Sequence, residues 1–174
     1  MSGPPPKTAV RAGVITISTK GAAGERADES GPAMRDGLVA AGFAVVHEAL
    51  VPDDVERVAT AILAAVRAGA NVVLTTGGTG LSPNDVTPEA TRRVIDREVP
   101  GIAEALRARS LEKTAHAMLS RGVAGAIGQT LVVNLPGSPR AVTESLAVIV
   151  PVIPHAVELL AGESGERGHA AGRR

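Results

Sequence analysis

The sequence predicts an α/β fold, a three-layer αβα sandwich with a mostly parallel central sheet. Runs of aliphatic and β-branched residues alternate with segments whose apolar residues recur at helical spacing. This alternation is typical of parallel strands joined by right-handed helical crossovers. Apolar residues make up 44% of the 174 residues, yet there is one Phe and no Trp or Tyr. A core of Ala, Val, Leu and Ile suits helices that lie on a sheet whose strands are buried on both faces.

The first half of the chain contains three predicted strands, at the β-branched runs 10–17, 43–51 and 71–76. A glycine-rich loop after the first strand leads to a helix near residues 32–41, with Pro32 in its first turn and Gly42 as a stop signal. Residues 54–69 form the next helix, because their apolar side chains recur at helical spacing.

The second half of the chain has the same alternation. We expect helices at residues 88–97, 101–111, 139–150 and 155–161, and strands at residues 122–128 and 130–135. No internal repeat or linker interrupts the pattern, so residues 9–161 are expected to form one domain. The ends, residues 1–8 and 162–174, have the composition of disordered segments.

Composition excludes several classes of function. The formal net charge is zero and no basic stripe with interleaved aromatic residues occurs, so nucleic-acid binding has little support. The chain has no Cys, which excludes disulfides, thiolate metal sites and a cysteine nucleophile. No run of about 18 uncharged apolar residues indicates a membrane span, and residues 1–8 lack the apolar segment of a signal peptide. We therefore expect a soluble, cytoplasmic protein.

Polar residues gather where the predicted strands end. Ligands bind outside the carboxyl ends of the strands in an open parallel sheet, and all the candidate site residues follow such ends. They are Ser18; Asp53 with Asp54; Thr76, Gly77, Gly78, Thr79 and Gly80, with Asp85 downstream; and Asn134, Pro136, Gly137 and Ser138.

The stretch from Thr76 to Gly80 has two interpretations. It could be a plain strand-to-helix turn, since glycine often ends strands. One glycine would suffice for a turn, however, and here three glycines are interleaved with hydroxyls. We favour a phosphate cradle, in which glycines let backbone N–H groups approach anionic oxygens beside a helix N-terminus. The stretch is neither a Walker loop nor a dinucleotide fingerprint, because it lacks GKS or GKT and the GxGxxG spacing.

Asp53 and Asp85 also leave two possibilities open. Each could cap a helix or close an Asx-turn, and Asp54 could supply the same first-turn charge as Asp53. Alternatively, Asp53 and Asp85 bind Mg²⁺, which prefers one or two carboxylates together with waters and substrate phosphates. Ser138 could be only the N-cap of the following helix, or could also hold an anion there. The residues alone thus indicate a phosphate site and leave Mg²⁺ open.

Four motifs together carry a family resemblance. They are TTGGTGLSPNDVTPEAT, VPG, AMLSRGVAG and VVNLPGSPRAV, in this order. Through them the chain resembles the MogA/MoaB family of molybdenum-cofactor biosynthesis proteins, which includes the N-terminal domain of gephyrin. The resemblance covers residues 10 to about 161, and the combination of TGGTG, D-x-T-P-E-A and N-L-P-G-S-P is specific. The three-layer α/β fold of that family agrees with the predicted one.

The resemblance implies a molybdopterin adenylyltransferase. In that reaction the terminal phosphate of molybdopterin attacks the α-phosphate of ATP, pyrophosphate leaves, and the product is passed on for metal insertion. The functional, Mg²⁺-binding aspartates of the family match Asp53 and Asp85. Its phosphate cradle matches Gly77 to Gly80, and its pterin-side loop matches Pro136 to Ser138, with Ser18 after the first strand. The molybdenum-insertion enzyme is the implied partner.

Two positions depart from the pattern of many relatives. Thr19 stands where an acidic residue is common, and Asn84 where an Arg is common. Loss of an Arg beside phosphates removes a charge-assisted contact, which Lys20 or Arg140 could replace. The alternative is therefore a pterin-binding paralogue without catalysis; a nucleotide pyrophosphatase and a scaffold have less support.

The resemblance also implies a homotrimer. We expect its interface near the segment from Gly101 to Met118, where the apolar candidates are Ile102, Ala105, Leu106 and Met118. The same side chains could instead only pack on the sheet.

Overall fold

The computed structural model describes residues 8–162, whose six strands form one sheet in the order β2-β1-β3-β6-β5-β4. The strands are β1 (Arg11–Ile17), β2 (Ala44–Val51), β3 (Val72–Thr76), β4 (Arg97–Glu98), β5 (Ala124–Ile127) and β6 (Thr130–Leu135). β2, β1, β3 and β6 run parallel, whereas β5 pairs antiparallel with both β6 and β4. The carboxyl ends of the four parallel strands therefore lie along one edge of the sheet.

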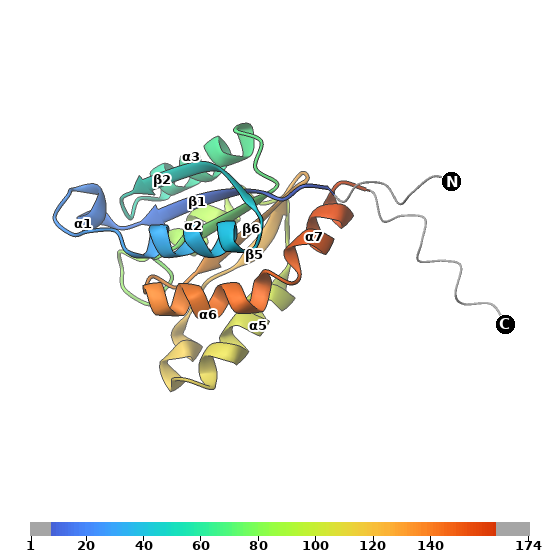
Figure 1. Cartoon of the computed structure of the whole chain (residues 1–174). Coiled ribbons are helices and arrows are strands. Elements are labelled where there is room, and N and C mark those ends of the chain that lie inside the picture. Colours follow the sequence, from blue (N-terminus) through green and yellow to red (C-terminus); the bar gives the residue numbers. More distant parts are fainter. Residues whose placement is uncertain (1–7, 163–174) are drawn as a thin grey trace, which may run out of the picture.

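Helices cover both faces of this sheet (Figure 1), which confirms the predicted three-layer fold. One face carries α2 (Ser30–Ala40), α5 (Pro100–Leu111), α6 (Pro139–Ile149) and α7 (Ile153–Leu160). The other face carries α3 (Val55–Arg67) and α4 (Thr87–Arg92). On β1, Val14 packs into the first core and Ile15 into the second. Neighbouring residues of one strand enter opposite cores, as expected for strands buried on both faces.

The structure adds three short elements that the sequence patterns do not predict: α1 (Thr19–Ala22), β4 and the 3₁₀ helix η1 (Ala115–Leu119). The helix expected at residues 88–97 ends at Arg92, because Arg97 and Glu98 pair with β5 instead. β5 and β6 are joined by the two residues Gly128 and Gln129. So short a connection permits only an antiparallel pair.

The ends expected to be disordered, residues 1–8 and 162–174, lie outside the described residues except for Thr8 and Gly162. Within residues 8–162, no single helix is long and apolar enough to cross a membrane. The pair α6 and α7, bent by 61°, passes that test of length and composition only when the two are taken together.

Candidate active site

The loops that follow the four parallel strands meet at one edge of the sheet, as predicted. The backbone N–H of Ser18 donates to the carbonyl of Val51 at 2.9 Å, which joins the ends of β1 and β2. The N–H of Gly77 donates to the carbonyl of Leu135 at 3.2 Å, which joins the ends of β3 and β6. A Cβ added to Gly137 would lie 3.3 Å from the Cα of Gly77. The glycine loop and the loop after β6 are therefore in contact.

Gly77 and Gly78 adopt backbone conformations that exclude other residues. Their φ angles are +97° and +64°, in the region that side chains with a Cβ rarely adopt. A Cβ on Gly77 would collide with the carbonyl oxygen of Ile17, and a Cβ on Gly78 with Oγ1 of Thr87. Two consecutive glycines are thus needed to turn the chain this closely against β1 and α4.

The carbonyl groups of residues 77–80 all accept hydrogen bonds from the protein. Thr87 donates to the first two carbonyls, from its hydroxyl at 2.9 Å and from its backbone N–H at 3.1 Å. Arg121 donates to the other two, from its backbone N–H at 2.8 Å and from Nε at 2.7 Å. The whole loop is therefore anchored through its carbonyl side.

This anchoring leaves the N–H side of the same peptides free. In a planar trans peptide the C=O and N–H bonds point in opposite directions, so the N–H groups of residues 78–81 point away from the donors that hold their carbonyls. Within the described part of the chain, these N–H groups have no hydrogen-bond acceptor. Successive free N–H groups form a concavity that binds anions. The geometry therefore favours the phosphate cradle over a plain turn.

The structure separates the roles of Asp53 and Asp54. Asp54 is the N-cap of α3, because its side chain accepts from the N–H of Arg57 at 2.9 Å. Asp53 instead accepts from the N–H and the hydroxyl of Thr19, at 2.9 and 2.8 Å, through Oδ2. Its Oδ1 lies 3.1 Å from where a Cβ on Gly78 would stand. Asp53 is thus the carboxylate that faces the glycine loop.

Asp85 faces the same loop from the other end. Its Oδ2 lies 2.8 Å from the position of a Cβ on Gly80 and accepts from the N–H of Ser82 at 2.9 Å. It does not cap α4, whose N-cap residue Val86 makes no side-chain capping bond. The bond to Ser82 runs back along the chain, so it is not the Asx-turn before Thr87 that the sequence left open, and it leaves Oδ1 of Asp85 without a partner among residues 8–162.

The two carboxylates suit a hard cation that also binds phosphate. Among the hydrogen bonds of residues 8–162, Asp53 and Asp85 each keep one oxygen free, and both flank the free N–H groups. No group of three or more His, Asp or Glu side chains in the described residues could hold a metal ion by itself. Mg²⁺ commonly takes one or two carboxylates and completes its shell with waters and phosphate oxygens. The donor set therefore fits Mg²⁺.

Four predicted site residues have side chains that hold the loops in place. Asn134 is buried: its Nδ2 donates to the hydroxyls of Thr75 and Thr91, and its Oδ1 accepts from the N–H of Val123 at 3.1 Å. Thr76 donates to the carbonyl of Pro136 at 2.7 Å. Ser18 and Ser138 are the N-caps of α1 and α6.

At the start of α6, the backbone is the part that remains available to a ligand. The N–H groups of Gly137 and Ser138 have no acceptor within residues 8–162. They stand at the N-terminus of an 11-residue helix, where the helix dipole favours negative charge. The capping and anion-binding interpretations of Ser138 are therefore compatible.

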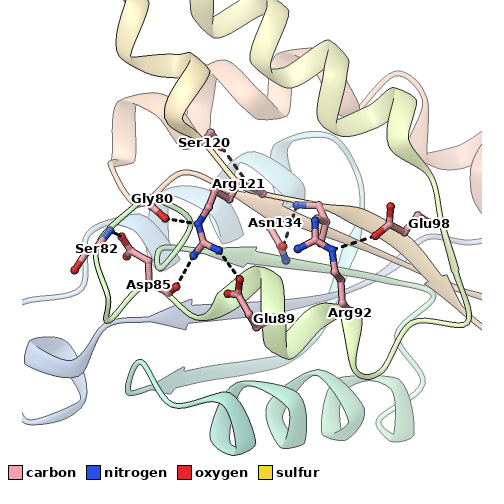
Figure 2. A network of polar contacts seen from close by, with 11 residues as sticks. Gly80, Ser82, Asp85, Glu89, Arg92, Glu98, Ser120, Arg121 and Asn134 are labelled. Carbon is pink, nitrogen blue, oxygen red and sulfur yellow. Dashed lines mark hydrogen bonds and ion pairs between the residues drawn. The ribbon is translucent and has the colours of Figure 1, made fainter.

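Sequence reasoning assigned no role to Arg121, Glu89 or Thr87, and it noted Thr19 only as a departure from the family pattern. Arg121 lies in the segment between η1 and β5, and its side chain reaches Gly80, Asp85 and Glu89 (Figure 2). Its guanidinium hydrogen bond holds the pKa of the Glu89 carboxyl below its ordinary value, against the opposing effect of burial. Arg121 occurs in the quoted motif AMLSRGVAG. That motif was the one signal that could have pointed to it.

An apolar cleft of about 300 Å³ adjoins the glycine loop. It lies between α5, η1 and the ends of β3 and β6, and four predicted site residues line it: Thr79, Gly80, Asn134 and Pro136. Leu106 and Ala117 contribute to its apolar wall, and Arg107 and Lys113 add positive charge. The volume falls in the range of small-molecule sites.

Comparison with known proteins identifies the family of the chain. Residues 13–155 match the family described as "Probable molybdopterin binding domain". The chain is 43% identical to a molybdopterin adenylyltransferase of Pyrococcus furiosus, over 86% of this chain and 90% of the relative. It is 39% identical to gephyrin of Dictyostelium discoideum over 85% of this chain, but it spans only 22% of gephyrin.

Among solved structures, the crystal structure of the molybdopterin biosynthesis enzyme MoaB of Thermus thermophilus superposes with a TM-score of 0.82 at 50% identity. The match covers 88% of this chain and 97% of MoaB. The chain spans half or less of the gephyrin-like and bifunctional relatives that it matches. The motifs, the fold and these matches together place the chain in the MogA/MoaB family of molybdenum cofactor biosynthesis proteins.

Proposed function

We propose that the protein is a molybdopterin adenylyltransferase that uses Mg²⁺ and ATP. One observation carries the proposal: the four free N–H groups of residues 78–81 are flanked by the carboxylates of Asp53 and Asp85. This arrangement can hold a polyphosphate and its cation together. Relatives that the chain matches over about 90% of their length, in Pyrococcus furiosus and Helicobacter pylori, are named molybdopterin adenylyltransferase.

Each part of the site has a role in this transfer. The N–H groups of residues 78–81 hold phosphate oxygens, and those of Gly137 and Ser138 hold a second phosphate at the N-terminus of α6. The apolar cleft beside them takes an aromatic ring system. Asp53 and Asp85 would hold Mg²⁺, which neutralises the charge of the triphosphate when it is bound.

The reaction itself forms and breaks one bond. An oxygen of the pterin phosphate attacks the α-phosphorus of ATP, and the bond from that phosphorus to the oxygen bridging to the β-phosphate breaks. Pyrophosphate leaves with the electron pair. The attacking phosphate oxygen is already deprotonated near neutral pH, so the transfer needs no general base. Positioning and charge neutralisation then supply most of the catalysis.

Turnover with defined substrates tests the proposal. The protein, incubated with molybdopterin, ATP and Mg²⁺, should form adenylylated pterin and an equal amount of pyrophosphate, measured by chromatography. Asp85→Asn should lower turnover by about 100-fold or more, as loss of a charged group at a transferring phosphate does, while pterin affinity changes little. Asp54→Asn is the matched control, because Asn caps helices as well as Asp. Bound pterin with no product would contradict the proposal.

The second candidate is a pterin-binding role without turnover. It is favoured by the two hydrogen bonds from Thr19 to Oδ2 of Asp53, which leave only Oδ1 for a cation. Under this alternative, the protein binds molybdopterin but binds ATP with Mg²⁺ no better than without it. Calorimetric titration of ATP with and without Mg²⁺ distinguishes the two functions.

We also propose that the protein acts as a homotrimer in the cytoplasm. Of the predicted interface candidates, Leu106 is buried and Ile102 packs against the core, whereas Ala105 and Met118 are exposed. Leu111 and Leu119, on the same segment or directly after it, are also exposed. Closed assembly needs a sizeable complementary patch. Met118→Arg should therefore convert a species of three-chain mass into monomers, as measured by light scattering; a wild-type mass near one chain excludes the trimer.

A further inference from the structure

Arg121 connects the glycine loop to the loop that carries Asp85 (Figure 2). Its Nε donates to the carbonyl of Gly80 at 2.7 Å, and its Nη2 donates to the carbonyl of Asp85 at 2.6 Å. Its Nη1 pairs with the carboxylate of Glu89 on α4. The planar guanidinium, with five N–H donors in a fixed fork, thus binds three separate acceptors at once.

We infer that Arg121 is a positioning residue of the phosphate site: it turns the Gly80–Leu81 peptide so that its N–H faces the ligand, and Glu89 holds the guanidinium in that orientation. The inference rests on the proposed function, because it concerns the phosphate groups that this loop would bind.

The peptide group between Gly80 and Leu81 depends on this side chain more than its neighbours do. Thr87 holds the carbonyls of Gly77 and Gly78, and the Thr79 carbonyl bonds to the backbone of Arg121. Among the carbonyls of residues 77–80, that of Gly80 alone is held by the guanidinium. Without it, that peptide could rotate and present its carbonyl oxygen to an anion, which repels it. The charged donor also polarises the peptide and strengthens its N–H as a donor.

Glu89 fixes the guanidinium from the side opposite the glycine loop. The side chains of Arg121 and Glu89 are 32% and 46% exposed, so their ion pair adds little stability by itself. Its effect is geometric. Nη1 of Arg121 is paired with Glu89, and this orients Nε and Nη2 toward the carbonyls of Gly80 and Asp85.

Arg92 provides a matched control on the same surface. It lines one polar groove together with Arg121, and it pairs with Glu98 at 3.1 Å rather than with the glycine loop (Figure 2). Arg92→Gln removes the same positive charge as Arg121→Gln and leaves every hydrogen bond of the loop in place. A difference between the two variants therefore measures the loop contacts rather than the net charge.

The experiment measures pyrophosphate binding by calorimetry in the presence of Mg²⁺, at constant ionic strength. It also records the backbone amide signals of ligand-free protein by NMR. Arg121→Gln should weaken binding on the order of tenfold, the effect of losing charge-assisted hydrogen bonds, and should shift the Leu81 amide signal while those of Gly78 and Thr79 stay in place. Arg121→Lys should recover part of the affinity, and Arg92→Gln should bind like wild type.

The contrary outcomes are distinct. If wild-type protein does not bind pyrophosphate, the proposed function fails. If wild type binds and folded Arg121→Gln binds equally well, or Arg92→Gln loses as much, only the positioning role fails. Weak binding with an unmoved Leu81 amide means that Arg121 touches the phosphate directly, which also overturns the inference. If Arg121→Gln does not fold, Glu89→Gln provides the test. The inference requires that the Leu81 amide signal of Glu89→Gln differ from that of wild type. If both this signal and the pyrophosphate affinity are unchanged, the inference is overturned.

Discussion

Two neighbouring loops at the same sheet edge are held in different ways. In the glycine loop, all four carbonyls of residues 77–80 are anchored by Thr87 and Arg121. In the loop at residues 136–138, the carbonyl of Pro136 accepts from the side chain of Thr76 at 2.7 Å and that of Ser138 from the N–H of Val142 at 2.9 Å, whereas the Gly137 carbonyl has no donor within residues 8–162. Both loops offer free N–H groups, but only the first offers them from a fully fixed backbone. A fixed row of donors needs no reorganisation when charge binds, which favours the first loop as the place where the proposed function would hold a triphosphate.

The two loops nevertheless share one kind of anchor, a buried threonine hydroxyl. Thr87 and Thr76 are both fully buried, and each donates its hydroxyl to a loop carbonyl. The difference lies in what surrounds that bond: the glycine loop has three further anchors, whereas the loop at residues 136–138 passes directly into α6. Substitutions that remove equivalent atoms from the two loops can therefore test whether rigidity or mere donor count sets phosphate affinity.

The largest effect is expected from adding a methyl group to the glycine loop. Gly78→Ala forces a Cβ into the Oγ1 of Thr87 at a φ of +64°. Such strain costs about 1–3 kcal/mol. If the free loop relieves it by leaving the phosphate-binding conformation, ligand binding must restore that conformation, which predicts a loss of pyrophosphate affinity of about 5- to 150-fold. Gly137→Ala is the equivalent change in the other loop, where the new Cβ meets the Cα of Gly77 at 3.3 Å. Its effect should be several times smaller.

Calorimetric titrations and thermal unfolding of both variants provide the measurement. Gly101→Ala controls for the substitution itself, because its Cβ would meet no atom within 4 Å. Equal losses for Gly78→Ala and Gly137→Ala would show that the two loops hold phosphate in the same way.

A smaller effect is expected from the two buried threonines. Thr87→Val and Thr76→Val each remove a hydroxyl donor and leave one loop carbonyl unsatisfied. Each should lower the free energy of unfolding by about 1–3 kcal/mol. Only Thr87→Val should also weaken pyrophosphate binding markedly. The carbonyl that Thr87 holds belongs to Gly77 in the anchored glycine loop, whereas the carbonyl that Thr76 holds belongs to Pro136 in the other loop. Chemical unfolding and calorimetry check both quantities, and equal loss of affinity in the two variants would contradict the comparison.

The anchored loop also shows what sequence reasoning can and cannot reach. The buried strand β3 and the glycines after it were predictable, because a run of aliphatic residues and a cluster of glycines are local signals. Thr87, which anchors the carbonyls of Gly77 and Gly78, follows Gly77 by ten residues in the sequence. Periodicity does not reveal such a contact, since it depends on how α4 returns to the loop.

Two further parts of the site depended on three-dimensional information. Asp53 and Asp54 both precede α3, and either could cap it; only the hydrogen bonds to Thr19 and Arg57 assign the cap to Asp54. Arg121 reaches Gly80 across 41 residues of chain, from a segment next to the antiparallel β5. The motif AMLSRGVAG marks the segment that contains Arg121, but it does not show that the side chain reaches Gly80.

The smallest expected effect is a pH-dependent change in thermal stability, which depends on the ion pair between Arg121 and Glu89. Hydrogen bonding from Arg121 lowers the pKa of Glu89 in the folded protein. A lowered folded pKa contributes stability above the unfolded pKa of about 4.3, and this contribution disappears as the pH falls through the folded value. Wild type should therefore melt above Glu89→Gln near neutral pH. The gap should close in acid, where Glu89 becomes neutral like Gln.

The size of this gap follows from the exposure of Glu89, whose side chain is 46% accessible. Exposed ion pairs contribute about 1 kcal/mol or less, which corresponds to at most about 2–4 °C in a domain of this length. Thermal unfolding of both proteins from pH 7 down to pH 3 measures it. A gap that is constant across this range would mean that the Glu89 charge does not stabilise the Arg121 anchor, and the rigidity of the glycine loop would then rest on Thr87 and the Arg121 carbonyl contacts alone.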